Sequence, residues 1–251
     1  MNTILSLIIL LSQDTLRQDN IMSTAITILE HLDELPNMKI KTLAQLSFTS
    51  TNSIIKFCQL LGFNTYSEFK QHLVSNKKTR EEQLHTKCLN LSKSEIYLKM
   101  KPFIVAEYDF NELDRTIDQF IDLIDKYKCI HFYGAVFPLT LLSSFLEDMA
   151  IMSIPIYVHQ MIPRKLEVEK NNGLNVIVTL TGRFFEINSL GFEQVCNNLN
   201  NIVLISKQNY YHLHIFKHIL LPKTVSSDYD DIIYLLLLDL IKYKYYQKRF
   251  K

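Results

Sequence analysis

Apolar residues in the first part of the chain recur at helical spacing. Residues 4–35 contain two such segments around a polar break at Ser12–Arg17. The second segment follows a suitable helix cap at Asp19 or Asn20 and ends before Pro36. This pattern predicts two helices at the start of the chain.

Two shorter periodic segments come next. Residues 40–46 predict a short helix, and residues 51–61 predict another that ends at Gly62, a residue type common just after helix C-termini. Ser50 suits the N-cap of the second of these helices, with its hydroxyl reaching back to an amide near Ser53. Two helices joined by a short turn are typical of a helix-turn-helix.

Residues 66–100 have a highly charged pattern that predicts a helix, and the chain after them alternates between predicted strands and helices. Alternation of this kind predicts a parallel, doubly wound sheet. We therefore expect an α + α/β protein with a helix-turn-helix domain at 1–75, a helical linker at 76–105 and a sheet domain at 106–251. The predicted strands are 129–134, 154–159, 175–182, 201–206 and 218–222, with helices from Phe110, from Pro138, from Glu186 and after Asp228.

Charge is distributed unevenly over the 251 residues. The whole chain has a formal charge of only +1. Between Lys39 and Arg80, however, seven basic residues stand against one acid, Glu68, so that this segment is net +6. Such asymmetry indicates a basic module joined to a neutral or acidic one.

The four cysteines are widely spaced and form no CxxC pair, which favours reduced thiols in the cytoplasm over a zinc site or disulfides. The apolar run at 4–11 is shorter than the roughly 20 residues that span a bilayer. We expect a cytoplasmic protein with no membrane partner and no metal. A surface cluster is favoured over a metal site for His212, His214 and His218.

The segment "TLAQLSFTSTNSIIKFCQLLGFNTYSEFK" resembles the DNA-binding domain of the RpiR/MurR family of bacterial transcriptional regulators. That family has a short helix with Leu-Ala, then Ser-x-x-Ser/Thr-Val/Ile-x-Arg-Phe, then Leu-Gly-Phe and an aromatic-rich segment. Lys56 stands where the family has arginine, which keeps the charge but loses the bidentate fork. The matching positions are Leu43, Ala44, Ser50, Ser53, Ile54, Lys56, Phe57, Leu61, Gly62, Phe63 and Phe69.

The helix after Ser50 begins with small polar residues and no carboxylate, as suits a helix that approaches phosphates. A recognition helix presents its first turns to base edges. We assign Thr51 and Asn52 to base edges, and asparagine suits the N6/N7 edge of adenine. Ser50, Ser53, Lys56 and Lys41 are assigned to phosphates or nearby edges. In the alternative interpretation Ser50 only caps, Ser53 only packs and Lys56 is only solvated.

The second half is similar to the family's sugar isomerase (SIS) domain, a flavodoxin-like fold that usually senses a phosphorylated sugar. The resemblance implies ligand-binding roles for six residues in the turns "GAVFPL" and "TLTGRFFE". Val136, Phe137, Pro138 and Phe184 stand where the family has small or hydroxylated residues, which favours an altered or lost effector site over an intact one. The six residues are Gly134, Thr179, Thr181, Gly182, Arg183 and Glu186.

Together these features predict a regulator that binds double-stranded operator DNA as a homodimer or homotetramer. The resemblance implies control of carbohydrate or phosphosugar genes, with a sugar phosphate as the candidate effector and no other cofactor. The alternative is a SIS-fold sugar-phosphate isomerase-type enzyme, and a third reading is a family member that acts through protein contacts alone. No catalytic residue is assigned, because Glu147 and Asp148 are better explained by a solvated or dimer-facing helix.

Overall fold

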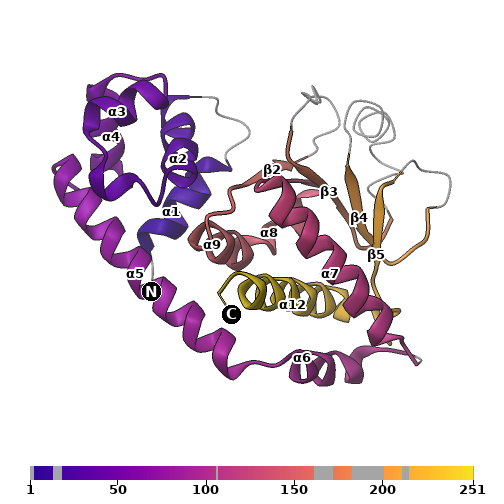
Figure 1. The fold of residues 1–251 in the computed structure, drawn as a ribbon. Coiled ribbons are helices and arrows are strands. Elements are labelled where there is room, and N and C mark those ends of the chain that lie inside the picture. The colour runs from indigo at the N-terminus through magenta and orange to yellow at the C-terminus, as the bar shows by residue number, and fades with distance from the viewer. Residues whose placement is uncertain are drawn as a thin grey trace. The chain divides into compact units, whose positions relative to one another are not determined.

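The computed structural model describes residues 3–13, 19–105, 107–160, 172–182, 201–210 and 215–250. The chain divides into two compact units. The first consists of Met1–Lys87 with Leu146–Pro155, and the second of Cys88–Phe145 with Ile156–Lys251. Figure 1 shows the helices of the first unit and the parallel sheet of the second.

The first unit is helical. The carboxylate of Asp19 caps α2 by accepting hydrogen bonds from the backbone amides of Ile21 and Met22. The two helices predicted at the start of the chain are thus confirmed, as are the two that follow. The helices are α1 (Thr3–Ser12), α2 (Asn20–Glu30), α3 (Ile40–Leu46), α4 (Thr51–Leu60) and α5 (Tyr66–Asn90), with a 3-10 turn at Leu35–Asn37.

A small core holds α3 and α4 against the start of α5. Leu43 on α3 and Ile54 and Phe57 on α4 are buried. The rings of Phe57 and Phe69 meet edge to face with centroids 6.0 Å apart, an arrangement that aromatic pairs favour. This packing fixes the direction in which α4 leaves the turn after α3.

The chain returns to the first unit between two strands of the second. Helix α9 spans Ser143–Ile151, and its residues from Leu146 onward belong to the first unit. There Asp148 is buried and accepts hydrogen bonds from the guanidinium of Arg80, which also lies 3.6 Å from Glu147. The prediction that this helix exposes Asp148 to solvent or to a partner subunit is therefore wrong.

The second unit contains a five-stranded parallel sheet in the order β2-β1-β3-β4-β5. This is the flavodoxin-like order, in which the chain reverses direction across the sheet between β1 and β3. Every residue of β3 and β4 is buried, as expected for central strands covered on both faces. The predicted fold class is thus confirmed. The strands are β1 (Ile130–Gly134), β2 (Ile156–Gln160), β3 (Leu174–Thr179), β4 (Ile202–Ser206) and β5 (Lys217–Leu220).

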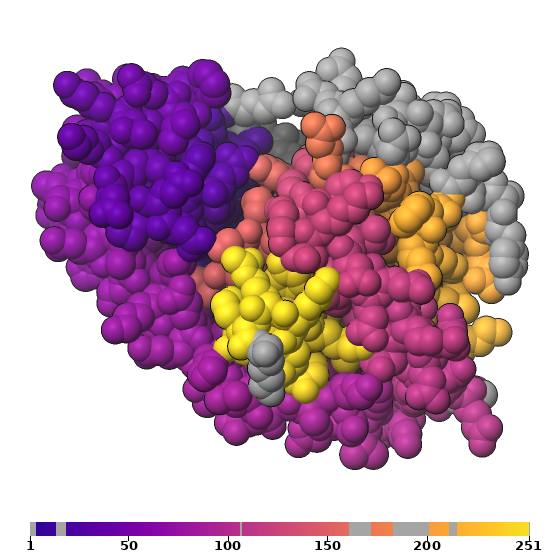
Figure 2. Space-filling model, viewed as in Figure 1, coloured from indigo at the N-terminus to yellow at the C-terminus, as the bar shows by residue number. Residues whose placement is uncertain are grey.

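Helices α7 (Phe110–Tyr127) and α12 (Asp230–Phe250) pack together beside the sheet. Their surfaces adjoin in Figure 2, where α12 is yellow and α7 is magenta. The carboxylate of Asp114 on α7 joins three helices, because it accepts hydrogen bonds from Lys244 on α12 and from Lys93 and Tyr97 on α6 (Lys93–Met100).

The expected boundary at residues 75 and 76 falls inside the continuous helix α5. The segment predicted as a linker consists of the remainder of α5, then α6 and a 3-10 turn at Lys101–Phe103. Among the helices that the structure describes, none has the length and apolar character needed to cross a membrane.

Candidate nucleic-acid interface

Ser50 and Ser53 form the cap at the start of α4. The hydroxyl of Ser50 accepts a hydrogen bond from the backbone amide of Ser53 at 3.1 Å, and the two hydroxyls lie 3.0 Å apart. The side-chain amide of Asn20 also reaches the hydroxyl of Ser53, at 3.4 Å. Both serines therefore already serve the helix, as the capping interpretation expects.

Other side chains in the first turns of α4 are exposed and, unlike Ser50 and Ser53, form no hydrogen bonds with described residues. Thr51, Asn52 and Lys56 are exposed, and the first turn of α4 contains no acidic residue. None of these three side chains is engaged by another residue in the parts of the chain that the structure describes. Asn52 and Lys56 are four residues apart and so lie on one helix face. This face combines an amide with a flexible cation.

The basic residues between Lys39 and Arg80 fall into two groups. Lys70 donates to the carbonyl of Met38, Lys77 pairs with Asp33 at 2.6 Å, and Arg80 pairs with Asp148. These three cations therefore have partners inside the first unit, and the local charge of +6 overstates what is free for DNA. The group that is exposed and pairs with no described residue comprises Lys39, Lys41, Lys56 and Lys78.

Four of the six residues predicted to bind an effector follow two adjacent strands. Gly134 ends β1, Thr179 ends β3, and Thr181 and Gly182 come directly after β3. Because β1 and β3 are parallel neighbours, these residues lie at the same edge of the sheet. The residues of this prediction that fall outside the described ranges are Arg183, Phe184 and Glu186.

The turn after β3 is held by a hydrogen bond between two of its own residues. The hydroxyl of Thr179, only 2% exposed, accepts a hydrogen bond from the backbone amide of Gly182 at 3.2 Å. Gly182 has a φ of +79°, a conformation that favours glycine. At Gly134 a Cβ would lie 2.8 Å from the carbonyl oxygen of Val178, so this position requires glycine for close packing of the two strands.

The turn after β1 leads into the short helix α8 (Val136–Thr140), which begins with apolar residues. Val136 and Phe137 are about half exposed, whereas Pro138 is buried. Proline has no backbone N–H to donate. These features support the prediction of an altered effector site, which stays a prediction.

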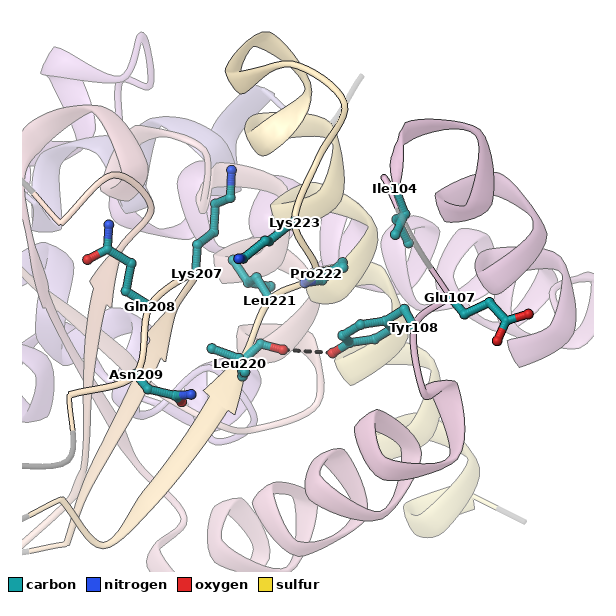
Figure 3. Close-up of a pocket in the computed structure, with 10 residues that line it drawn as sticks. All are labelled: Ile104, Glu107, Tyr108, Lys207, Gln208, Asn209, Leu220, Leu221, Pro222 and Lys223. Atoms are coloured by element: carbon teal, nitrogen blue, oxygen red, sulfur yellow. Dashed lines mark hydrogen bonds between the residues drawn. The ribbon is translucent and has the colours of Figure 1, made fainter.

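A cavity of about 470 Å³ lies at a different part of the sheet, beyond the ends of β4 and β5 (Figure 3). The hydroxyl of Tyr108 donates to the carbonyl of Leu220 across one side of it, at 2.7 Å. Lys207 lines another side, and its ammonium is held by Asp230 at 2.6 Å and by Thr224 at 3.0 Å. The volume is typical of small-molecule sites. Sequence reasoning missed this cavity, whose only signal was a lysine directly after a strand.

A pair of histidines on adjacent strands was also missed. Nδ1 of His131 on β1 lies 2.9 Å from Nε2 of His159 on β2. The pKa of each imidazole is lowered to about 4, for His159 by burial and for His131 by burial together with the neighbouring His159. Both rings are therefore neutral at physiological pH. The pairing depends on the strand order, which the sequence pattern did not specify.

The proposed histidine surface cluster is only partly described. His218 on β5 hydrogen-bonds the hydroxyl of Ser206 at 2.7 Å, while His212 and His214 lie outside the described ranges. Over the residues that the structure describes, no three His, Cys, Asp or Glu side chains are grouped so that they could hold a metal ion.

Comparison with protein families identifies the first part of the chain. Residues 13–79 match the model of the helix-turn-helix domain of the rpiR family. The matched segment contains α2, α3, α4 and the first half of α5, and with it every residue assigned to DNA. The resemblance noted from residues 42–70 is thus confirmed.

Several solved structures are similar to this chain. Hypothetical protein MJ1247 from Methanococcus jannaschii, whose structure was taken to infer a 3-hexulose-6-phosphate isomerase function, is 20% identical, with 62% of this chain and 87% of that chain covered and a TM-score of 0.46. The NanR protein of Vibrio vulnificus, solved in complex with ManNAc-6P, is 12% identical over 97% of this chain and 92% of that one, with a TM-score of 0.39. At such scores neither likeness carries an argument about this chain.

Proposed function

We propose that this chain, an rpiR-family protein by its helix-turn-helix domain, is a transcriptional regulator that binds double-stranded operator DNA through the start of α4. In this proposal Thr51 and Asn52 contact base edges. Lys56 and Lys41 contact phosphates, and Ser50 and Ser53 add contacts from the helix cap.

One observation carries the proposal. The first turns of α4 expose a hydroxyl, an amide and an ammonium group that the rest of the first unit does not use, and no acid lies among them. Recognition helices read DNA with their N-terminal residues. Asparagine can pair with both hydrogen-bonding atoms of adenine in the major groove, and a lysine beside it can neutralise a phosphate.

The second unit supplies assembly and effector sensing in this proposal. A single helix-turn-helix covers one half-site, so regulators of this kind bind as dimers whose half-sites are about one helical turn apart. We infer a cytoplasmic homodimer or homotetramer that controls carbohydrate or phosphosugar genes. A small anion or an apolar ligand, rather than a common sugar phosphate, would modulate DNA binding from the edge with Gly134, Thr179, Thr181 and Gly182. The family resemblance adds Arg183 and Glu186 to the residues assigned to that ligand.

We further infer that the chain is not an enzyme. An isomerase-type reaction requires an acid or base held within reach of the substrate. Glu147 and Asp148, the first acids in the sequence after the turn that follows β1, are engaged with Arg80 in the first unit. The observation thus favours the regulator over the sugar-phosphate isomerase alternative.

A gel-shift titration with the promoter region of the chain's own gene, repeated across salt concentrations, tests the proposal. Affinity should fall steeply with salt because bound phosphates release counterions. Lys56→Glu should weaken binding to every sequence. Lys99→Glu, an equal charge change at an exposed position of α6, should have little effect. Equal affinities of wild type and Lys56→Glu at low salt would remove the assignment of α4 as the DNA reader.

A further inference from the structure

Among the described residues of the first unit, the most exposed large apolar side chain stands in the turn that precedes α4. Phe48 is 94% exposed, whereas the next most exposed large apolar residues of the same unit are Leu10 at 65% and Leu60 at 56%. It is also one of four non-glycine residues with a positive φ in the described part of the chain, at +52°. The residue therefore combines two unfavourable features.

The backbone around Phe48 explains the positive φ. The amide of Phe48 donates to the carbonyl of Gln45 at 3.1 Å, and the amide of Thr49 donates to the carbonyl of Ala44 at 2.8 Å. These two bonds define a Schellman ending of α3, whose left-handed residue is usually glycine. A side chain with a Cβ is strained there.

The end of α4 provides an internal comparison. Gly62 has a φ of +88°, its amide donates to the carbonyl of Gln59, and the amide of Phe63 donates to the carbonyl of Cys58. The same motif thus occurs twice within the twenty residues 44–63, once with glycine and once with phenylalanine. A glycine would satisfy the turn after α3 equally well, so the turn does not explain the choice of phenylalanine.

The turn cannot relax to relieve the strain, because its neighbour is anchored. Ser47 is 1% exposed, its hydroxyl donates to the carbonyl of Leu43, and its carbonyl accepts the hydroxyl of Ser23 on α2 at 2.7 Å. Residues held in such conformations concentrate at functional sites. Packing does not offset the strain, since the ring of Phe48 is almost wholly in solvent.

We propose that Phe48 is a specificity-determining residue that places its ring against the methyl group of a thymine at the edge of the operator half-site. This inference rests on the proposed function. Phe48 lies two residues before the N-cap Ser50 and three before Thr51, so it enters the groove beside the residues assigned to base edges. A thymine methyl group is the apolar feature of the major groove, and phenylalanine is among the side chains that contact it.

The central experiment replaces Phe48 with glycine. Phe48→Gly should raise the thermal midpoint of the protein by a few degrees, because the strain is removed and no packing is lost. The DNA probe is a sequence that the wild type selects from random DNA. Phe48→Gly should bind this probe roughly fivefold more weakly than the wild type does, which is the low end of the affinity loss expected for a single base contact. Greater stability with weaker operator binding distinguishes a functional residue from a structural one.

A second arm identifies the contacted group. Each thymine of the selected sequence is replaced in turn by deoxyuridine, which lacks the methyl group. At one thymine in each half-site the wild type should lose affinity, while Phe48→Gly should bind both forms of the probe equally. Leu60→Ala, which removes another exposed apolar side chain at the far end of α4, should behave like the wild type.

Two results would overturn the inference while leaving the proposed function intact: operator binding by Phe48→Gly that equals the wild type, or a wild type that is indifferent to every deoxyuridine substitution. Failure of the wild type to select any DNA sequence would instead remove the proposed function itself.

Discussion

Nη2 of Arg80 lies 2.6 Å from Oδ1 of Asp148, and Nε of the same guanidinium lies 2.9 Å from that oxygen. The carboxylate side chain is 2% exposed and the arginine side chain 23% exposed. The pair joins α5 to the part of α9 that belongs to the first unit. Because α9 follows α8 closely, the chain that forms the turn after β1 continues into a segment that is anchored to α5 of the first unit.

Removal of Asp148 should destabilise the first unit. Asp148→Ala leaves the guanidinium without its buried partner. We therefore expect the free energy of unfolding to fall by about 2–3 kcal/mol. This loss is smaller than the one typical of a fully buried ion pair, because Arg80 is partly exposed. Urea denaturation measures this. The matched control is Glu112→Ala, which breaks the exposed pair with Arg115 and should cost under about 0.5 kcal/mol. Equal effects of the two variants would contradict the importance of burial here.

Asn52→Ala should change sequence preference more than general affinity. A base contact provides roughly 1–3 kcal/mol of discrimination, whereas random DNA is bound through its phosphates. Binding titrations with operator and random probes measure the two affinities. Gln59→Ala, on the same face two turns later, should leave both unchanged. Parallel losses on operator and random DNA would show that Asn52 does not read bases.

Asp114 should make the second unit sensitive to strong acid. Burial raises the pKa of this carboxyl, but hydrogen bonds from Lys244, Lys93 and Tyr97 outweigh burial and lower it to about 2. A depressed carboxyl pKa contributes stability that is present above its ordinary value near 4 and is lost as the pH falls toward 2. Asp114→Asn should therefore be less stable than wild type by about 1–2 kcal/mol at pH 7, with the difference shrinking below pH 4. A difference that is constant from pH 7 to pH 2.5 would contradict this.

The pair His131 and His159 should affect the stability of the fold at a higher pH than Asp114 does. The pKa of His131 and of His159 is about 4 in the folded chain, below the ordinary value of 6.5. The unfolded chain then binds more protons between these values, so stability falls as the pH decreases from about 6.5 to 4. In His159→Phe, which keeps a ring beside Tyr133, the decline of the urea midpoint over this window should be shallower than in wild type. If the urea midpoint of His159→Phe declined as steeply as that of the wild type, the loss of stability over this pH range would be due to other groups.

Local patterns in the sequence predicted local structure well. The turn and cap between α3 and α4 follow from Ser50 and from the apolar spacing of residues 40–46, and the structure has both. The strands were found because buried parallel strands are short apolar runs between helices. What determines these features lies within a few residues of each.

The features that were missed depend on residues far apart in the chain. Arg80 and Asp148 are separated by 68 residues, and nothing near either one shows that α9 leaves the sheet for the helical unit. The contact between His131 and His159 requires β1 and β2 to be neighbours, which the alternation of strands and helices leaves open. Phe48 was missed because the local pattern gives no reason to expect a left-handed phenylalanine.

We expect common hexose and amino-sugar phosphates to bind weakly or not at all, because a phosphate needs several donors converging at a helix N-terminus. At this edge Pro138 has no N–H, the hydroxyl of Thr179 is occupied by the amide of Gly182, and Phe137 stands where the family has a small residue. Calorimetry with a panel of sugar phosphates should show dissociation constants above about 1 mM.

Inorganic phosphate at equal ionic strength is the reference for nonspecific anion binding in that titration. Thr181→Ala tests the exposed threonine at the edge, and Thr42→Ala, an exposed threonine of α3, is its control. Micromolar binding of a hexose phosphate that is lost in Thr181→Ala and kept in Thr42→Ala would show that the sensor is intact. The remaining threonine and backbone amides would then be sufficient for the phosphate, and the apolar residues after β1 would contact the sugar rather than exclude it.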